Sequence, residues 1–480
     1  MKILFIMPSM DNGYWKKLGK KVGPRSEPMS LVYIASTLNH YGHNASILDC
    51  ESEGLSLQDV EQHLKEGNFE MVGIAMLTVM YTQTLELAKL VKRINPNTNV
   101  VVGGPHPSTN AMQIIKEVPE IDIAVIGEAE FTFMDLVRAV EDKKSFADIK
   151  GIAYRNEKGE AVMTPEREMI QDLDSIPIPD RSLLRMHLYR PSVSYYKKLP
   201  AYIVLTSRGC PYRCTFCSKV FEKTYRYNSP ERVIAEMKDL VENFGAKEIV
   251  FRDDTFTMKR SWTEEVCKKI IDEGLHEKIR WSCMTRVNLV TLDLLKLMKK
   301  AGCWGIHFGV ESGNQRLLDL MKKDVTVEQI RNAFKWTREA GIETRAFMMI
   351  GLPTETREES LETIEFAKSL DPDWAQFTIC TPYPGTEMFR QAIETGEMKS
   401  TEWDNYQTWG GFSDHSLVFV PQGRTSNELK NLQKYALRSF YFRPKVIARK
   451  ITNIDNLPIL RKYVTGAVAL MAGVTERAAE

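Results

Sequence analysis

Three cysteines lie close together near the middle of the chain, in the stretch S-R-G-C-P-Y-R-C-T-F-C-S at residues 207–218. Cys210, Cys214 and Cys217 have the spacing C-x3-C-x2-C. Thiolates are the usual ligands of 4Fe–4S clusters, so three thiolates on one short loop can hold three of the four irons. The fourth iron then has no protein ligand and can bind a small molecule.

Two other roles for these thiols fit the sequence less well. A structural zinc site takes four ligands, often as two close pairs, but no fourth Cys is nearby and the nearest histidines are His187 and His276. Disulfide frameworks are typical of short secreted chains. This chain has 480 residues, and its first seven, MKILFIM before a proline, are expected to form a strand and not a secretory signal. The spacing therefore favours an iron–sulfur cluster.

Length and composition describe an ordinary globular protein. A chain of 480 residues is expected to form two or three domains. It is 43% hydrophobic and 26% charged, and its formal net charge of +1 gives no field that would attract nucleic acid. No apolar run approaches the ~20 residues that span a bilayer. We expect a cytoplasmic location, which also suits an oxygen-sensitive cluster.

Residues 1–140 alternate short apolar strands with helices. Near-continuous apolar strands separated by helices predict an α/β domain with a doubly wound parallel sheet, flavodoxin-like or Rossmann-like, covered on both faces. Ligands of such sheets bind beyond the carboxyl ends of the strands. The five strands are expected at residues 2–7, 45–49, 71–76, 100–103 and 123–126.

Small and polar residues follow these strand ends. The paired glycines in V-G-G-P-H-P at 102–107 allow a backbone to approach a ligand closely, although a tight turn is the alternative interpretation. The candidate ligand-binding residues of this edge are Ser9, Thr78, Gly103, Gly104, His106, Gly127 and Glu128.

A connector at residues 141–200 leads to a second repeat of strands and helices at residues 201–385. The connector contains a predicted hairpin at 151–164 and several prolines. Six β/α units then predict a partial, TIM-like (β/α)6 barrel, in which active residues follow the carboxyl ends of the strands. The cysteine loop follows the first of these strands, which are expected at 202–207, 248–253, 279–286, 304–311, 344–351 and 374–381.

Residues 386–480 are expected to form a helical C-terminal segment. It begins with an aromatic patch, Trp403, Tyr406, Trp409 and Phe412, which suits a large apolar ligand or plain core packing. Basic residues precede a final apolar run at 463–474 that is too short to span a membrane. This run is expected to form a terminal helix, or else to lie on a membrane surface as a peripheral contact.

Taken together, these motifs resemble the radical S-adenosylmethionine (SAM) enzymes that carry an N-terminal cobalamin-binding domain. The resemblance rests on C-x3-C-x2-C with Phe216 before the last cysteine, on G-V-E-S-G at 309–313, and on T-P-Y-P-G-T at 381–386. In the first domain it rests on P-M-S-L at 28–31, on G-H at 42–43, on Asp49, and on G-G-P-H-P. The family includes the anaerobic tetrapyrrole ring cyclase and the hopanoid and chlorophyll-type C-methyltransferases.

The resemblance implies that SAM chelates the open iron and lies along the strand ends of the second domain. It implies that Glu311 holds the ribose hydroxyls and that Phe216, Ile350 and Gly351 flank the adenine. Arg286 would pair with the SAM carboxylate, with a surface ion pair as the alternative, and Asp254 is either part of the site or a solvated acid. The implied SAM-binding residues are Phe216, Asp254, Arg286, Glu311, Ser312, Ile350 and Gly351.

The first domain departs from the family pattern in two places. The motif G-E-G-E is G-E-A-E here, with Ala129 replacing a glycine. The motif D-x-H-x-x-G, which supplies a cobalt ligand in mutase-type proteins, is missing, because no histidine has a glycine three residues later. Bound cobalamin is therefore not expected to take that kind of histidine ligand, and a cobalamin-free domain that only positions substrate stays open.

The implied function is a cobalamin-dependent C-methyltransferase with a 4Fe–4S cluster and SAM. It would act on an unactivated carbon of a large apolar substrate, of tetrapyrrole or polycyclic isoprenoid type, through a 5′-deoxyadenosyl radical and methylcobalamin, with electrons from an external flavodoxin or ferredoxin. A radical SAM oxidative cyclase or rearrangement enzyme is one alternative, and a non-enzymatic cobalamin or iron–sulfur binding protein is another. Methylthiotransferases carry a second set of N-terminal cysteines, whereas this first domain has only Cys50.

Overall fold

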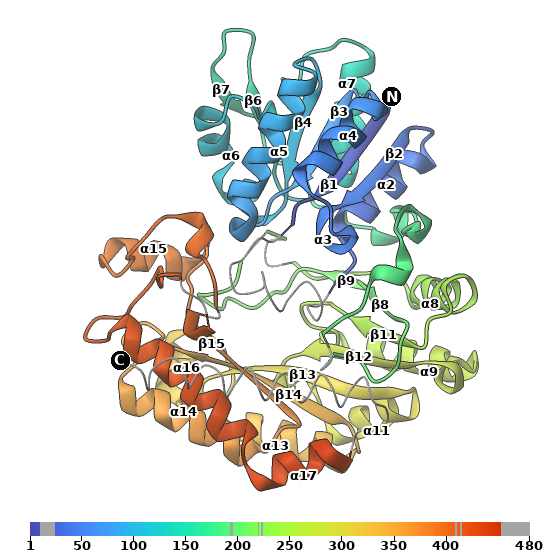
Figure 1. The fold of residues 1–480 in the computed structure, drawn as a ribbon. Coiled ribbons are helices and arrows are strands. Elements are labelled where there is room, and N and C mark those ends of the chain that lie inside the picture. Colours follow the sequence, from blue (N-terminus) through green and yellow to red (C-terminus); the bar gives the residue numbers. More distant parts are fainter. Residues whose placement is uncertain are drawn as a thin grey trace.

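The computed structural model describes residues 1–9, 25–192, 195–218, 220–221, 224–408, 410–412 and 415–452. Two sheets built mainly of parallel strands, each with its own helices, lie one above the other in Figure 1. The carboxyl edge of the upper, N-terminal sheet faces the lower sheet. The α/β fold with parallel sheets that the sequence predicts is confirmed.

The N-terminal sheet has the parallel strand order β2-β1-β3-β4-β5, which is the flavodoxin-like order. Alternate residues of each strand enter two separate cores: Leu4 and Ile6 on one face, Ile3 and Phe5 on the other. Helices on both faces keep these strands out of water, which is why the strands are apolar throughout. The strands are β1 (Lys2–Met7), β2 (Asn44–Asp49), β3 (Met71–Ala75), β4 (Asn99–Gly103) and β5 (Ile123–Val125), and the helices are α2 (Met29–His40), α3 (Cys50–Glu53), α4 (Leu57–Gly67), α5 (Tyr81–Ile94), α6 (Pro105–Glu117) and α7 (Glu130–Glu141).

The predicted hairpin belongs to this sheet and not to a separate connector. Strands β6 (Ile152–Arg155) and β7 (Ala161–Met163) pair antiparallel with each other, and β6 pairs antiparallel with β5. The N-terminal sheet therefore has seven strands. The local turn signal predicted the hairpin, but nothing local specifies the strand on which a hairpin docks.

The second sheet has six parallel strands in sequence order, and the sequence located all six. Outer side chains pack against helices, as where Phe308 contacts Phe334 with ring centroids 5.2 Å apart. The strands are β8 (Ala201–Val204), β11 (Glu248–Phe251), β12 (Arg280–Thr285), β13 (Cys303–Glu311), β14 (Glu343–Ile350) and β15 (Trp374–Ile379). The helices are α8 (Pro230–Phe244), α9 (Arg260–Asp272), α10 (Leu275–Lys278), α11 (Leu292–Lys300), α12 (Gln315–Leu320), α13 (Val327–Glu339), α14 (Arg357–Leu370) and α15 (Glu387–Glu394).

Two C-terminal helices, α16 (Ser426–Tyr441) and α17 (Pro444–Thr452), pack on the last strand of this sheet. Gln433 donates to the carbonyl of Phe377 at 2.8 Å, and the Tyr441 hydroxyl donates to the carbonyl of Ala375 at 2.8 Å. The predicted helical segment is thus observed up to residue 452. The apolar run at 463–474 and Trp409 lie outside the described residues.

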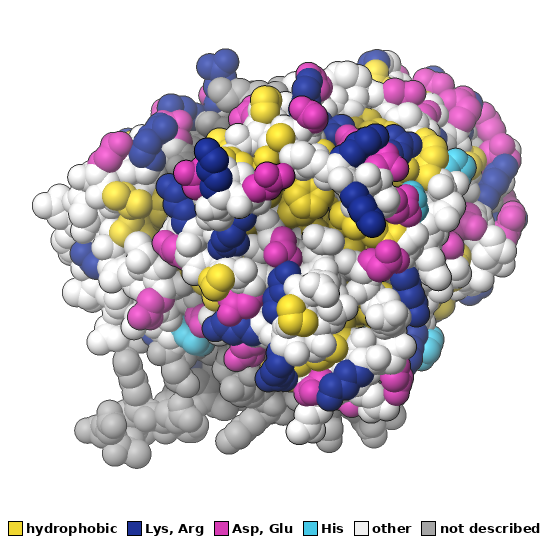
Figure 2. All heavy atoms as spheres, turned by 90° about the horizontal axis from the view of Figure 1, so that it is seen from above, with side chains coloured by type: hydrophobic (Ala, Val, Ile, Leu, Met, Phe, Trp, Pro, Cys, Tyr) yellow, Lys and Arg dark blue, Asp and Glu magenta, His cyan; other side chains and the backbone are white. Residues whose placement is uncertain are grey.

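Charged side chains are spread over the surface without a dominant sign. Figure 2 shows Lys and Arg interspersed with Asp and Glu on the face that is seen from above. This distribution agrees with the formal net charge of +1. In the part of the chain that the structure describes, no helix has both the length and the apolar character needed to cross a membrane.

Candidate functional site

The cysteine loop is anchored at both ends and at its centre. Strands β9 (Ser207–Arg208) and β10 (Arg226–Tyr227) pair antiparallel around it. Gly209 has φ +84°, and a Cβ there would lie 2.2 Å from the carbonyl oxygen of Thr224, so only glycine fits this turn. The backbone of Thr215 donates to Met321 O at 3.0 Å and accepts from Met388 N at 2.9 Å. These bonds tie the loop to the ends of α12 and α15.

A buried acid, Asp253, organises the start of this loop, and sequence analysis did not select it. Its Oδ1 accepts from the Thr206 amide and hydroxyl, both at 2.8 Å, and from the Ser207 hydroxyl at 2.6 Å. Burial raises the pKa of Asp253 to about 6, against the opposing effect of these hydrogen bonds. The signal in the sequence is the pair Asp253-Asp254 after β11, of which only Asp254 was predicted as a site residue.

The three thiols differ in burial. Cys214 is buried, whereas Cys210 and Cys217 are more open. The Cys217 amide donates to Cys214 O at 3.2 Å, and Cys210 Sγ lies 3.8 Å from Thr255 Oγ1. Desolvation, followed by the charges of Asp254, Cys214 and Cys210, raises the pKa of the Cys217 thiol to about 12. Cys217 is therefore protonated without metal, and bound iron would deprotonate it.

These donors suit a cluster better than a single ion. Among the described residues, no three His, Cys, Asp or Glu side chains converge as they would around one metal ion. Thiolates that each bind a different iron of a 4Fe–4S cluster do not need to converge in this way. The chemistry of the donor set, three thiols on one loop, fits the cluster.

Arg286 follows β12 and contacts the cysteine loop instead of facing open space. Its guanidinium stacks on Tyr212 at 3.5 Å, and Nη1 donates to Cys214 Sγ at 3.6 Å. Nη2 donates to the Lys323 carbonyl, and Nε donates to Asn288 Oδ1 at 3.3 Å. Pairing of Arg286 with the SAM carboxylate stays a prediction, since these bonds use three of the five N–H groups of the guanidinium. Because hydrogen bonds to the sulfurs tune the reduction potential of such clusters, the bond from Arg286 to Cys214 would affect the potential of a bound cluster.

Glu311 ends β13 in a conformation that proteins rarely adopt without a reason. Its φ of +66° is left-handed, which costs a non-glycine residue energy and is found most often at functional sites. Its Oε1 accepts from Lys323 Nζ at 2.9 Å, and both side chains are buried. A Cβ on Gly309 would lie 2.6 Å from Glu311 Oε1, so the glycine makes room for the carboxylate.

Lys323 joins this group although sequence analysis missed it. Its ammonium lies 5.6 Å from the ring centroid of Phe216, the aromatic residue before the last cysteine. The contact brings the G-V-E-S-G motif against the cysteine loop. The sequence carries no signal for it, because one lysine in the pair at 322–323 resembles any surface cation.

The other predicted SAM residues are placed as follows. Asp254 lies within electrostatic range of Cys217, and desolvation raises its pKa. The Ser312 hydroxyl is 3.0 Å from Thr363 Oγ1 and accepts from the Asn314 amide, so it shapes a turn. Ile350 points into the outer core. Gly351 has φ +75°, and a Cβ there would meet Leu429 of α16 at 3.1 Å.

In the first domain, the two carboxylates of the G-E-A-E motif form hydrogen bonds with arginines of the second domain and do not face open space. Glu128 Oε1 accepts from Arg208 Nη1 at 2.9 Å, while Oε2 accepts from Arg226 Nη1 and from the Ile170 amide, both at 2.7 Å. Glu130 accepts from Arg208 Nη2 at 2.6 Å. Burial opposes ionisation, but the two arginines outweigh it and hold the pKa of Glu128 below its usual range.

This network joins the two domains at the cysteine loop. Arg208 and Arg226 belong to β9 and β10, the strands that flank the loop. Contact of Glu128 with cobalamin stays a prediction, because in this structure its carboxylate oxygens accept hydrogen bonds from protein groups. Glu128 and Glu130 fix the N-terminal domain to the base of the cysteine loop.

His106 and Thr78 lie together under a residue of the C-terminal segment. His106 Nδ1 is 3.2 Å from Thr78 Oγ1, and its ring meets those of Trp403 and Tyr81 edge-on at 4.9 and 5.2 Å. Burial lowers the pKa of His106 to about 4, so it is neutral at pH 7. The aromatic patch thus covers one part of the strand edge.

The remaining predicted residues divide into closed and open positions. Ser9 donates to Glu51 Oε2 at 2.7 Å. Gly104 has φ +123°, and an added Cβ would lie 2.9 Å from Met76 O, so the glycine lets the loop after β4 pack closely against the loop after β3. A Cβ added to Gly127 would have no neighbour within 4 Å, and a Cβ added to Gly103 would meet only Val125, at 3.9 Å. This bare edge, which faces the lower sheet in Figure 1, fits the approach of a large cofactor.

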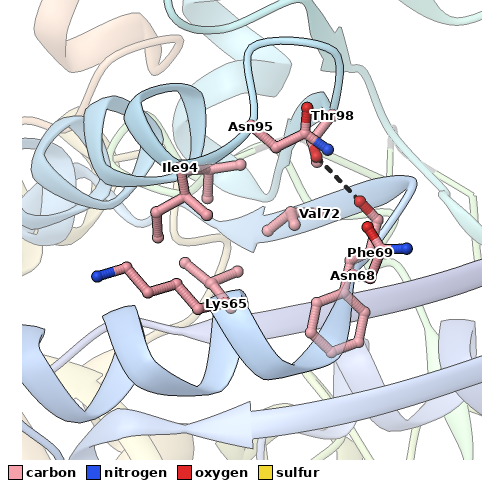
Figure 3. A pocket seen from close by; sticks show the side chains of 9 residues that line it. Lys65, Asn68, Phe69, Val72, Ile94, Asn95 and Thr98 are labelled. Atoms are coloured by element: carbon pink, nitrogen blue, oxygen red, sulfur yellow. Dashed lines mark hydrogen bonds between the residues drawn. The ribbon is translucent and has the colours of Figure 1, made fainter.

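A separate pocket of about 340 Å³ lies at the opposite edge of the N-terminal sheet. In Figure 3, Phe69, Val72 and Ile94 line it, and Thr98 is bonded to the Phe69 carbonyl. Its residues come from α4, α5 and the starts of β3 and β4. It contains none of the predicted site residues.

Comparison with known proteins matches both halves of this architecture. Residues 204–367 match the radical SAM superfamily, and residues 15–137 match the B12 binding domain. An uncharacterized methyltransferase of Pyrococcus horikoshii is 37% identical over 94% of this chain and 95% of its own length. The anaerobic magnesium-protoporphyrin IX monomethyl ester cyclase of Rubrivivax gelatinosus is 31% identical over 98% of this chain and 82% of its own.

Solved structures agree at the level of fold. The cobalamin-dependent SAM radical enzyme OxsB, with aqua-cobalamin and SAM bound, matches with a TM-score of 0.76 at 16% identity, over 98% of this chain and 71% of that one. The radical SAM methyltransferase TsrM from Kitasatospora setae, with cobalamin and a [4Fe-4S] cluster, matches with a TM-score of 0.71 at 19% identity, over 90% and 84%.

Proposed function

The chain belongs to the radical SAM enzymes that carry a cobalamin-binding domain, and from this premise we propose that it is a C-methyltransferase acting on an unactivated carbon of a large, mostly apolar substrate. Its cofactors are a 4Fe–4S cluster, SAM and cobalamin. The observation that carries the proposal is the 37% identity, over nearly the full length of both chains, to a protein named as a methyltransferase.

When bound, the cluster and SAM supply a radical that removes hydrogen from carbon, and cobalamin supplies the methyl group. Cys210, Cys214 and Cys217 hold the cluster, and Arg286 positions Cys214 by donating to its sulfur. Glu311, oriented by Lys323, would accept hydrogen bonds from the ribose hydroxyls of SAM.

The first domain holds cobalamin at the bare edge formed by Gly103 and Gly127. The ion pairs of Glu128 and Glu130 with Arg208 keep this edge next to the cysteine loop. His106 stays with Thr78 under Trp403, so bound cobalamin would take no ligand from that histidine, and we expect it in the base-off form. The paramagnetic resonance spectrum of the cob(II)alamin form would contradict this if it showed nitrogen splitting from any axial ligand.

The proposed function is tested by labelled methyl transfer. Purified, anaerobically reconstituted enzyme would receive SAM with a deuterated methyl group, a reduced flavodoxin, and a panel of tetrapyrrole and hopanoid substrates. We expect one product that carries a deuterated methyl group, together with 5′-deoxyadenosine. A panel that consumes SAM only to 5′-deoxyadenosine and yields an unmethylated, oxidised product would contradict methyl transfer.

That second outcome corresponds to an oxidative cyclase. It is supported by the 31% identity to the magnesium-protoporphyrin IX monomethyl ester cyclase. Magnesium-protoporphyrin IX monomethyl ester therefore belongs in the panel. Formation of a new ring without a methyl group would identify the cyclase reaction. We further propose that the electron comes from an external flavodoxin or ferredoxin, so omission of the reduced flavodoxin should abolish 5′-deoxyadenosine formation.

Replacing Glu311 with alanine is expected to weaken SAM binding without loss of the cluster. A buried carboxylate that accepts from hydroxyls contributes about 1.5–3 kcal/mol per charged hydrogen bond, equivalent to roughly 10- to 150-fold in Kd. Equilibrium binding of SAM to the reconstituted protein measures the change. Glu362→Ala, an exposed acid paired with Asn314, is the control. Unchanged SAM affinity in Glu311→Ala would show that the ribose is held elsewhere.

A further inference from the structure

The side of the six-stranded sheet that faces away from its helices, called here the inner face, is reached by solvent. Along β14 and β15, the residues that face the helices are buried, while most of the alternate residues, which lie on the inner face, are partly exposed. The exposed members are largely apolar, with two polar side chains. Those on β12, β14 and β15 are Met284, Phe347, Met349, Trp374, Gln376 and Thr378.

One row across the inner face is cationic. The strand register places His307 beside Arg345 and beside Met284, and Arg252 Nη1 contacts Met284 Sδ at 3.6 Å. Both guanidinium groups lie over the ring of Tyr195, at 3.9 Å for Arg345 and 4.3 Å for Arg252. Two cations thus share one aromatic ring: Arg345 lies near the amino-terminal end of β14, whereas Arg252 follows the last residue of β11.

These cations lack a carboxylate partner within the described residues. Arg345 is 5% exposed, and its Nε makes no hydrogen bond there; the same is true of His307 Nδ1 at 3% exposure. Burial lowers the pKa of Arg345, and burial together with both arginines lowers that of His307.

The neighbouring acids form no ion pair with either arginine among the described residues. Glu343, two residues before Arg345, pairs with Lys197 at 2.6 Å, and Glu311 pairs with Lys323. Glu27, whose charge reaches Arg252, accepts from the Ile203 amide through Oε1 at 2.9 Å; its Oε2 makes no hydrogen bond there, and burial raises its pKa. A buried arginine without a counter-charge is costly, so this row is a built site for an anion.

We propose that the inner face binds the substrate as an amphiphile, with an anionic end, a carboxylate or a phosphate-type oxyanion, held by Arg345 and Arg252. The inference deepens the proposed function and rests on it only for the position of the reacting carbon. His307 lies four residues before Glu311, about 13 Å along the strand. The anionic group of the substrate would therefore lie about 13 Å from the carbon that reacts near SAM. The apolar body between them would lie along Phe347 and Met349.

The test uses the anaerobically reconstituted holoenzyme and three single-chain probes: decanoate, decyl phosphate and the uncharged decanamide. Calorimetric titration should show at least one anion bound roughly tenfold or more tightly than decanamide, as expected for charge-assisted hydrogen bonds. The tighter of the two anions identifies carboxylate or phosphate chemistry. Arg345→Met should remove the preference, whereas Arg331→Met, an exposed arginine stacked on Phe366, should keep it. Equal affinity for all three probes, or a preference that survives Arg345→Met, overturns the proposal.

Thermal unfolding gives a second readout that does not depend on catalysis. The preferred anion should raise the Tm of the wild type but not of Arg345→Met. Without ligand, Arg345→Met should be about as stable as the wild type, because methionine replaces a buried cation that contacts the Tyr195 ring but has no carboxylate partner among the described residues. A clearly lower Tm in the ligand-free variant would mean that Arg345 already has a stabilising counter-charge, and would refute the argument. Methyl transfer enters neither readout, so failure here and failure of the methyltransferase proposal are separate results.

Discussion

Anaerobic reconstitution of a Cys214→Ala variant is expected to yield almost no bound iron, against about four irons per chain for the wild type. Cys214 is the buried member of the three thiols, and its sulfur receives a hydrogen bond from Arg286. With two thiolates left on the loop, two irons of the cluster would lack protein ligands. Reductive cleavage of SAM should fall below detection, since the electron donor is lost.

The matched control is Cys50→Ala, which removes a buried thiol in the first domain, far from the loop in sequence. It should keep about four irons per chain and its absorption spectrum. Iron and zinc are measured together on the same samples. Wild-type protein that binds one zinc and no iron, or a Cys214→Ala variant with an unchanged cluster, would contradict the assignment of these cysteines.

Glu128→Gln should destabilise the protein by about 3–5 kcal/mol, the usual cost of breaking a buried ion pair. The substitution leaves Arg226 buried and without its carboxylate, and removes one of the two acids on Arg208. Because these pairs join the first domain to the strands around the cysteine loop, hydrogen exchange at residues 207–210 should become faster. The denaturant midpoint of the transition that includes this interface measures the loss.

Glu168→Gln provides the comparison, since Glu168 is an exposed acid that pairs with Lys150 at 2.7 Å. Exposed ion pairs contribute little, so its midpoint should hardly move. The double variant Glu128→Gln/Arg226→Gln should cost less than the sum of the single changes, because it also removes the stranded cation. Strict additivity, or a single variant as stable as the control, would show that the pair does not hold the interface.

The same network predicts how stability depends on pH. The folded pKa of Glu128 lies below its ordinary value of about 4.3. The unfolded carboxyl therefore takes up a proton first, and the stabilisation is fully present above about pH 4.3 and lost as the pH falls through the lower folded value. In the Glu128→Gln variant this part of the acid destabilisation should be missing from unfolding curves.

The sequence by itself determined the features that depend on neighbours along the chain. The spacing of Cys210, Cys214 and Cys217 defines a three-thiol loop whatever the rest of the chain does. Apolar strands alternating with helices specify an α/β fold with parallel sheets, and in the first domain helices cover both faces of the sheet. The carboxyl-end rule selected Glu311, which ends β13 and is linked to Phe216 of the cysteine loop through Lys323; its contact with the SAM ribose stays a prediction.

Only the tertiary structure decided which side chains meet. Glu128 and Arg208 are 80 residues apart, Glu128 and Arg226 are 98 apart, and nothing in either motif encodes the pairing. Arg286, after β12, meets Cys214 although the two are 72 residues apart. That Arg345 has no carboxylate partner among the described residues is a property of the whole inner face, because it depends on every neighbouring strand. Periodicity is a local signal, whereas charge pairing and burial depend on distances that the chain sets only once it is folded.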